Sequence, residues 1–440
     1  MISTTPAFNL KVVLKETGIA ADTLRAWERR YGLPMPQRSA GGHRLYSQRD
    51  IETIKWLMKR QADGLSISRA VDLWNEQMAS GTDPLADLVQ TIDTAAIPVP
   101  YKPSETPLDS LRAQWIKACL NFSESAAEQA LNEAFSLFPV EAVCIDVLQK
   151  GLSEIGDRWY ENRASVQQEH FASALAIRRL DALLSASPAP TRSQIVLVGC
   201  PPEEWHTFTP LLLALLLRRR GLNVIYLGAN VPVDQFTSTV RDTNANLVAL
   251  IAQQLITAAS LQQTAQALSS LDIPVAFGGR IFNMQTELSA CIPGYFLGRD
   301  LISALDQIDL LLNRKLKLPQ PRVISPVHIA ARDAFTAKRG QIELTLKESI
   351  KRLSLAPKNV QTGIHFLGEN ITAGLQLGDI SYVSAEVEWL KTLLQFHEAQ
   401  PEQLIYFMQA YAEAVKKNLD GHGRLILEWF MREIEKLSAG

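Results

Sequence analysis

The chain has 440 residues, a formal net charge of −2, 47% hydrophobic residues and 20% charged residues. This length exceeds what one hydrophobic core serves, so we expect about three domains of ordinary globular composition. The polar start lacks a signal-peptide pattern, and the longest apolar run, Leu211–Leu217, is far too short to cross a bilayer. These features argue against a secreted or membrane protein and predict a cytoplasmic one.

The charge is unevenly distributed along the chain. Residues 1–60 contain eleven Lys and Arg against five acidic residues, a net charge of +6, which leaves −8 for the remainder. A basic end on an acidic body is typical of proteins in which one end faces nucleic acid.

The basic region begins with a predicted helix, turn and helix. Residues 11–16 form the first helix, Thr17-Gly18 the turn, and residues 22–31 the second helix. Asp22 is expected to cap the second helix, since its carboxylate can accept the N–H groups exposed in the first turn. Leu24 and Trp27 lie three residues apart and should point into the core.

A short hairpin is expected next, over residues 38–46, with Gly41-Gly42 permitting the tight turn. The predicted helix–turn–helix and hairpin leave basic and polar side chains free to contact phosphates and base edges. We expect the DNA-contacting residues to be Thr23, Arg25, Arg29, Arg30, Arg38, His43, Arg44 and Tyr46.

The string TLRAWERRYGLPMPQRSAGGHRLYSQRDI closely resembles the winged helix-turn-helix of the MerR family of transcription regulators. The resemblance places this domain at residues 1–78. It implies binding to double-stranded promoter DNA at two half-sites, and therefore a dimer or tetramer. It also implies a regulator and not an enzyme.

The character of the sequence changes three times after this domain. Residues 79–108 contain five prolines and no sustained apolar period, which is typical of a linker. Residues 109–187 have helical periodicity and predict a four-helix bundle. Residues 191–315 alternate short apolar runs with helical stretches, which predicts a Rossmann-like parallel α/β sheet. Its five strands are expected at 195–199, 224–228, 247–251, 275–279 and 295–298.

The last segment, residues 328–440, is predicted to be an all-α tail to which we assign no chemistry. Gly363, Gly368, Gly374 and Gly378 are expected to interrupt its helices. Its core is predicted to contain the aromatic residues Trp389, Tyr406, Phe407 and Tyr411.

The four cysteines, Cys119, Cys144, Cys200 and Cys291, lie far apart and form no CxxC pair. Their mostly apolar neighbours predict thiols buried in the core of a protein from a reducing compartment, and argue against a disulfide framework or a zinc site.

The bundle followed by a parallel sheet resembles the cobalamin-binding module of methionine synthase, and more closely that of the light-sensing CarH/LitR-type MerR repressors. In the predicted bundle, nine residues separate Trp159 from Glu169-His170. In the first strand–helix loop, Glu204-Trp205-His206 matches the start of an Asp/Glu-x-His-x-x-Gly motif. Gly278-Gly279 ends the fourth predicted strand.

This resemblance implies a role for each group. His206 would coordinate the cobalt of adenosylcobalamin from below, because neutral imidazole is a good ligand for that metal. Glu204 would hold the other nitrogen of His206. Gly278 and Gly279 would leave room for the cofactor tail at the carboxyl edge of the sheet. Trp159, with Glu169 and His170 nearby, would cover the upper face.

Three positions depart from the pattern. Thr209 replaces the usual glycine, the serine common after the third strand is absent near Ile251, and Tyr160 stands where light-sensing members have a second histidine. Two alternatives therefore stay open. The module would bind no cofactor and act through a protein partner such as an antirepressor, or, more remotely, the chain would be an accessory of a cobalamin-dependent methyltransferase or mutase.

Overall fold

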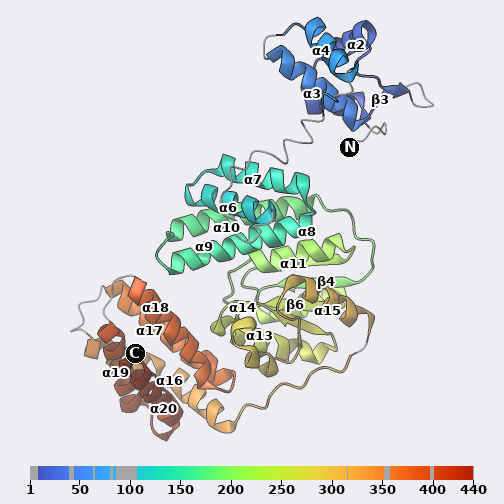
Figure 1. Cartoon of the computed structure of the whole chain (residues 1–440). Coiled ribbons are helices and arrows are strands. Elements are labelled where there is room, and N and C mark those ends of the chain that lie inside the picture. The colour runs from blue at the N-terminus through green and yellow to red at the C-terminus, as the bar shows by residue number, and fades with distance from the viewer. Residues whose placement is uncertain are drawn as a thin grey trace. The chain divides into compact units, whose positions relative to one another are not determined.

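The computed structural model describes residues 8–38, 44–62, 65–79, 83–85, 107–314, 316–350, 357–396 and 401–439 (Figure 1). The chain divides into two compact units, residues 1–104 and 105–440, which are described separately below. Most of the predicted linker, residues 79–108, lies outside the described residues. No helix among the described residues is long and apolar enough to cross a membrane.

The first unit has the predicted winged helix-turn-helix fold. Among its described residues, three short antiparallel strands form a sheet in the order β1-β3-β2, in which Arg38 pairs with Arg44. Leu24 and Trp27 are buried as expected, and Trp56 packs edge-on against Trp74 with ring centroids 5.3 Å apart. The described elements are β1 (Phe8–Asn9), α1 (Leu10–Thr17), α2 (Ala21–Tyr31), β2 (Gln37–Arg38), β3 (Arg44–Tyr46), α3 (Gln48–Ala62) and α4 (Ile67–Ala79).

The predicted cap of the second helix is wrong. The N-cap of α2 is Ala20, which makes no side-chain cap hydrogen bond. Asp22 lies inside the first turn, where its exposed carboxylate pairs with Arg25 at 3.4 Å. A negative charge in the first turn still interacts favourably with the helix dipole. The helix ends as expected for a glycine C-cap, with Gly32 in the left-handed region at φ 70°.

The second unit begins with the predicted four-helix bundle. Its third helix is composite, since α8 (Val140–Ala142) continues through the π-helical segment η1 (Val143–Gln149) into α9 (Lys150–Tyr160). Trp115 lies fully buried at the centre, and a Cβ on Gly151 would come within 2.8 Å of its ring, so the close approach requires glycine. The other helices are α6 (Pro107–Leu120), α7 (Glu124–Leu137) and α10 (Val166–Ser185).

The bundle is followed by the predicted five-stranded parallel sheet, with strand order β5-β4-β6-β7-β8. Alternate strand residues face opposite sides. Val196 and Ala249 pack with the bundle, α11 and α15, whereas Leu197 and Val248 pack with α12, α13 and the C-terminal helices. The elements are β4 (Ile195–Gly199), α11 (Phe208–Arg219), β5 (Asn223–Gly228), α12 (Val233–Thr243), β6 (Leu247–Ile251), α13 (Leu255–Leu268), β7 (Val275–Gly278), α14 (Arg280–Met284), β8 (Tyr295–Phe296) and α15 (Leu301–Asn313).

The tail is helical, as predicted, and packs on the α13 side of the sheet (Figure 1). Phe407 and Tyr411 are core residues, whereas Tyr406 is 39% exposed and Trp389 is only half-buried. Its described elements are α16 (Pro326–Ser349), α17 (Pro357–Gln376), η5 (Ile380–Val383), α18 (Ser384–Phe396), α19 (Pro401–Asn418), η6 (Gly421–Gly423) and α20 (Arg424–Ala439).

The predicted glycine breaks in the tail are mostly wrong. Gly363, Gly368 and Gly374 lie inside α17, and only Gly378 follows it, with φ 85°. A Cβ on Gly374 would lie 2.8 Å from a methyl carbon of Val383. At this position glycine allows two segments to pack closely and does not end the helix.

Candidate functional site

The exposed face of α2 presents the side chains expected to meet DNA. Thr23, Arg25, Arg29 and Arg30 are exposed, whereas Leu24 and Trp27 of the same helix are buried. The Arg30 guanidinium lies 5.7 Å from the centroid of the Tyr31 ring. The exposed surface of this helix therefore carries positively charged side chains that are outside the core and can contact DNA phosphates.

A carboxylate on α2 holds the adjacent strand of the hairpin. Glu28, whose side chain is 9% exposed, accepts a hydrogen bond from the Tyr46 hydroxyl at 2.5 Å and pairs with Nε of Arg44 at 2.8 Å. Burial, followed by the bond to Glu28, raises the pKa of Tyr46 far above its ordinary value. The orientation of β3 relative to the exposed helix is therefore fixed by two contacts to one side chain.

This arrangement changes the expected set of DNA contacts. Tyr46 is fully buried, so its position does not support a contact with DNA, and we do not retain it. Alternation along the strand explains its burial, because Tyr46 follows Leu45 and turns toward the core. The Arg44 side chain remains 36% exposed. His43 and the side chain of Arg38 lie outside the described residues.

The loop between β4 and α11 carries the predicted cobalt ligand. Nδ1 of His206 lies 2.6 Å from Oε1 of Glu204, and the backbone N–H of His206 donates to the same oxygen at 2.9 Å. Glu204 is completely buried, while the His206 side chain is 59% exposed. Because an ionised carboxylate only accepts hydrogen bonds, Nδ1 carries the proton and the lone pair of a neutral ring is on Nε2.

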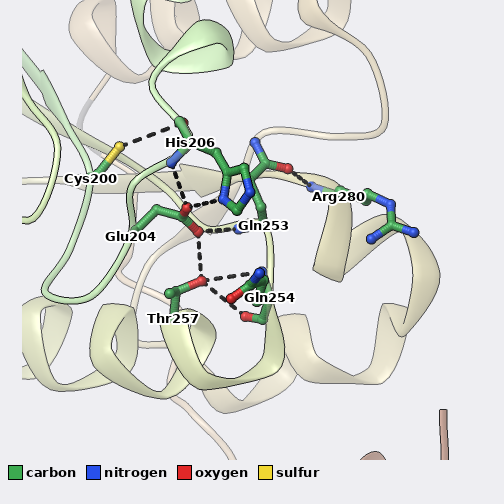
Figure 2. Close-up of polar contacts among 7 residues, drawn as sticks. All are labelled: Cys200, Glu204, His206, Gln253, Gln254, Thr257 and Arg280. Carbon is green, nitrogen blue, oxygen red and sulfur yellow. Dashed lines mark hydrogen bonds and ion pairs between the residues drawn. The ribbon is translucent and has the colours of Figure 1, made fainter. Parts of the chain in front are cut away.

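Glu204 also joins the first and third strand–helix loops of the sheet (Figure 2). Its Oε2 accepts the backbone N–H of Gln253 at 2.7 Å and the hydroxyl of Thr257, in α13, also at 2.7 Å. Neighbouring strands β4 and β6 continue into helices on opposite faces of the sheet, which creates the crevice where open α/β sheets bind ligands. The ring of His206 is thus anchored at this crevice.

Hydrogen bonding decides the ionisation of this pair. Burial alone would raise the pKa of Glu204, but the hydrogen bond and charge of His206, with the Thr257 hydroxyl, lower it below its ordinary value. The bond to Glu204 in turn raises the pKa of His206, against the effect of burial. The ionised carboxylate is therefore the stable form, as required to orient the imidazole.

The two glycines after β7 differ in their roles. A Cβ on Gly278 would make an ordinary van der Waals contact with Cβ of Leu297, at 3.9 Å, so the protein's own packing leaves room for a side chain there. A Cβ on Gly279 would lie 1.9 Å from the carbonyl oxygen of Ala252, and Gly279 has φ 125°. The protein's own backbone thus requires glycine at 279, whatever binds nearby. Only Gly278 fits the expected role of leaving room for a ligand.

The bundle contributes residues from one of its ends. Trp159 is half-buried near the end of α9, and Glu169 lies in the first turn of α10. The carboxylate of Glu169 accepts from Ser173 at 2.6 Å and lies 2.7 Å from Nδ1 of His170. Helix α10, which carries Glu169, packs on α11, the helix that directly follows the His206 loop. His170 is 74% exposed.

Sequence reasoning missed three neighbours of His206. Thr257, inside α13, donates its hydroxyl to the Glu204 carboxylate that holds His206. Gln253 links two loops, since its backbone N–H donates to Glu204 and its side-chain oxygen accepts from Arg280. The charge of Arg280 influences the pKa of His206. Of these three, only Thr257 could have been noticed in the sequence, because it is the first residue with a hydroxyl group after the buried strand β6.

Three family models match the chain. Residues 8–77 match the MerR HTH family regulatory protein, and residues 111–184 and 195–301 each match a B12 binding domain. The HTH-type transcriptional repressor CarH of Myxococcus xanthus is 28% identical over 275 residues, which are 62% of this chain and 88% of CarH.

Two further regulators are similar. The HTH-type transcriptional repressor CarA of Myxococcus xanthus is 31% identical over 245 residues, which are 55% of this chain and 75% of CarA. The HTH-type transcriptional regulator MlrA of Escherichia coli is 38% identical over 95 residues, 22% of this chain and 36% of MlrA. The winged helix-turn-helix, the bundle and the parallel sheet agree with these matches. The chain belongs to the MerR family of transcription regulators, and two further segments of it match B12 binding domains.

Proposed function

We propose that this regulator is a repressor that binds promoter DNA through the exposed face of α2 and senses adenosylcobalamin between its bundle and its sheet. The exposed Arg25, Arg29 and Arg30 support the first part, together with Arg44 on the hairpin. Arginine can bind both phosphate oxygens and guanine edges in the major groove. Two such surfaces in an oligomer would meet two half-sites of the promoter.

The observation that carries the cofactor proposal is the pair formed by Glu204 and His206. The buried carboxylate holds Nδ1, which leaves the lone pair of Nε2 for the cobalt. Thr257 and Gln253 hold the carboxylate in turn, as is usual for residues behind a metal-bound histidine. The room that Gly278 leaves by lacking a side chain would help to receive the cofactor tail, and Trp159 with Glu169 and His170 would cover the upper face.

Bound adenosylcobalamin would supply a cobalt–carbon bond that light can break. The chain would contribute two parts that the cofactor holds together, the end of the bundle near Trp159 and the loop of His206. A ligand that binds one oligomeric state better than another shifts the population toward that state. We infer that the loaded dark form is the DNA-binding oligomer and that illumination lifts repression.

The full chain should be incubated with adenosylcobalamin in the dark, desalted, and examined by visible spectroscopy before and after green light. We expect retained corrinoid absorbance that changes on illumination, together with a change of oligomeric state in light scattering. His206→Ala should lose most of the retained corrinoid. His328→Ala is a matched control, because Nδ1 of His328 is also held locally, 2.8 Å from Ser325 Oγ, but it lies in the tail.

Two outcomes would contradict the proposal. If the wild-type chain retains no corrinoid, the module acts without this cofactor, and binding of an antirepressor protein becomes the better explanation. If corrinoid is retained but His206→Ala retains it equally, the cobalt ligand is wrong while the cofactor is right.

A further inference from the structure

The tail touches the bundle beside the proposed cofactor site. The hydroxyl of Tyr160, the last residue of α9, donates to the backbone carbonyl of Trp389 in α18 at 3.2 Å. The two rings are stacked, with centroids 6.0 Å apart and planes inclined by 21°. Trp389 also packs against Phe366 of α17, at 5.9 Å. Tyr160 directly follows Trp159, so this contact adjoins the residue expected over the cobalt.

The same helix also faces the carboxyl edge of the sheet. Glu386 lies three residues before Trp389, and residues at this spacing share one side of a helix. Burial raises the pKa of Glu386, and the charge of Arg280 opposes that rise, which places α18 near the segment after β7. The backbone N–H of Arg280 donates to Oε1 of Gln253 at 3.0 Å, and the backbone N–H of Gln253 donates to Glu204 beside His206. Helix α18 therefore has the end of the bundle and the rim of the His206 site as neighbours.

The tail is anchored to the sheet and not only to the bundle. The side-chain amide of Gln376, at the end of α17, donates to the carbonyl of Ala259 in α13 at 2.7 Å, and both groups are buried. Gln285 donates to the carbonyl of Tyr382 at 3.1 Å. Apolar residues of α13 and α17 belong to one core. Movement of α17 or η5 away from the sheet would break these hydrogen bonds, so the tail is held on the sheet.

The bundle is consequently linked to the sheet by two routes. One is the direct packing of the bundle on α11, which shares a core with it. The other runs through α17 and α18 to Tyr160 (Figure 1). A ligand between Trp159 and His206 would fix the end of α9 against the sheet, and thereby fix Tyr160 against Trp389.

We propose that the C-terminal helical domain, residues 326–439, reads the state of the cobalamin site through the contact between Tyr160 and Trp389. This inference rests on the proposed cofactor function. Docking of α18 on α9 and binding of cobalamin favour each other, and by linkage each changes the other by the same factor. The tail is thus part of the sensor, because its docking on α9 changes with the occupancy of the cobalamin site.

The test uses the full chain, with and without adenosylcobalamin in the dark. Hydrogen exchange in α18 should slow when cobalamin is bound. Trp389→Ala should speed exchange in α9 of the cofactor-free chain and speed cobalamin dissociation by about 5-fold or more, the lower end of typical coupling between sites. Exchange in α20 serves to check that the tail of this variant remains folded.

A gentler variant and a matched control accompany it. Tyr160→Phe removes the hydroxyl but keeps the stacked ring, and should give a smaller change in the same direction. Tyr406→Phe removes a similar hydrogen bond, from the Tyr406 hydroxyl to the carbonyl of Ser349 at 3.1 Å, within the tail. It should leave cobalamin dissociation unchanged.

Unchanged exchange in α18 on cobalamin binding, together with wild-type dissociation from Trp389→Ala, would overturn the inference. If the wild-type chain retains no cobalamin, the proposed cofactor function fails and the coupling fails with it. The contact itself is then judged on the cofactor-free chain, where unchanged exchange of α9 in Trp389→Ala would overturn it separately.

Discussion

Oγ1 of Thr257 lies 2.7 Å from Oε2 of Glu204, and through this contact the helix after the third strand of the sheet holds the carboxylate that orients His206. Both partners are buried, so water does not reach them easily. Removal of either side chain would leave the other without this hydrogen bond, which costs free energy of folding. The contact joins the first strand–helix loop to α13, and its two residues are 53 positions apart in the chain.

Replacement of Thr257 by Val should therefore weaken both the fold and the cofactor site. The loss of one partner from a buried carboxylate is expected to cost about 1–3 kcal/mol of unfolding free energy. Cobalamin affinity should fall by about 10-fold, as for other residues that support a metal ligand. Denaturant unfolding and corrinoid titration measure the two effects. Thr264→Val, in the same helix, removes a buried hydroxyl that bonds only to the Ser260 carbonyl, and it should not change affinity. Equal affinities for the two variants would contradict the role of Thr257.

The arginines of α2 should determine the salt dependence of DNA binding. Arg29→Ala and Arg30→Ala each remove an exposed positive charge from the proposed interface. Each lost phosphate contact is expected to reduce the slope of log affinity against log salt by about 1. Arg432→Ala removes an exposed arginine from the tail and serves as the control. Fluorescence anisotropy with a promoter fragment, over a range of salt concentrations, measures the slopes. Identical slopes for all variants would exclude phosphate contacts by these arginines.

A pair at the junction of bundle and sheet should make stability depend on acid pH. Nε of Arg219 in α11 donates to Oε1 of Glu141 in α8 at 2.6 Å. This hydrogen bond lowers the pKa of Glu141 below its ordinary value of 4.5. A carboxylate with a lowered folded-state pKa stabilises the fold above its unfolded pKa, and this contribution disappears as the pH falls through the folded value.

The expected effect is small, because the side chains of Arg219 and Glu141 are 34% and 40% exposed, and water screens their interaction. Glu141→Gln should lower the free energy of unfolding by about 0.5 kcal/mol near neutral pH. The difference from wild type should shrink steadily below pH 4.5, the ordinary value for this carboxyl. A double-mutant cycle with Arg219→Gln isolates the pair. A difference that is constant between neutral and acid pH would contradict the assignment.

The cysteines should be unreactive in the native protein. Burial raises the pKa of three thiols, Cys119, Cys144 and Cys200, to about 12, and that of Cys291 also above its ordinary value. The thiolate is the reactive form, and a rise from 9.0 to about 12 lowers its fraction about a thousandfold. Titration with a thiol reagent should find no rapid reaction before denaturation and four thiols after it. Rapid labelling of the folded chain would contradict the buried positions.

The sequence predicted the helices and strands well, because their signals are local. The apolar runs that form β4, β6 and β7 are buried on both faces, as in parallel sheets generally, and such runs are visible without any partner strand. The link between Glu204 and His206 was also predictable, since the two residues lie in one short loop.

Other features depend on partners remote in the sequence. Tyr46 is buried because its hydroxyl bonds to Glu28 and its ring packs in the core. Gly374 lies inside a helix, where Val383 packs too closely for a larger residue. Thr257 contacts Glu204 from the helix after the third strand, and Tyr160 contacts a tail residue more than two hundred positions away. No local pattern marks such contacts, because they arise when separate elements pack. The capping role expected for Asp22 failed for a different reason, namely that α2 begins at Ala21, two residues before the start that an Asp22 cap requires.

The bond between Glu204 and His206 has a consequence for the strength of binding at Nε2. A side chain that is loose in the empty protein loses rotational freedom when it captures a ligand, at a cost of about 0.5–1.5 kcal/mol. Here the imidazole has already lost that freedom during folding, because a buried acceptor stops its rotation and selects its tautomer. Any metal that arrives at Nε2 thus meets a donor in its final orientation, so more of the bond energy remains as affinity.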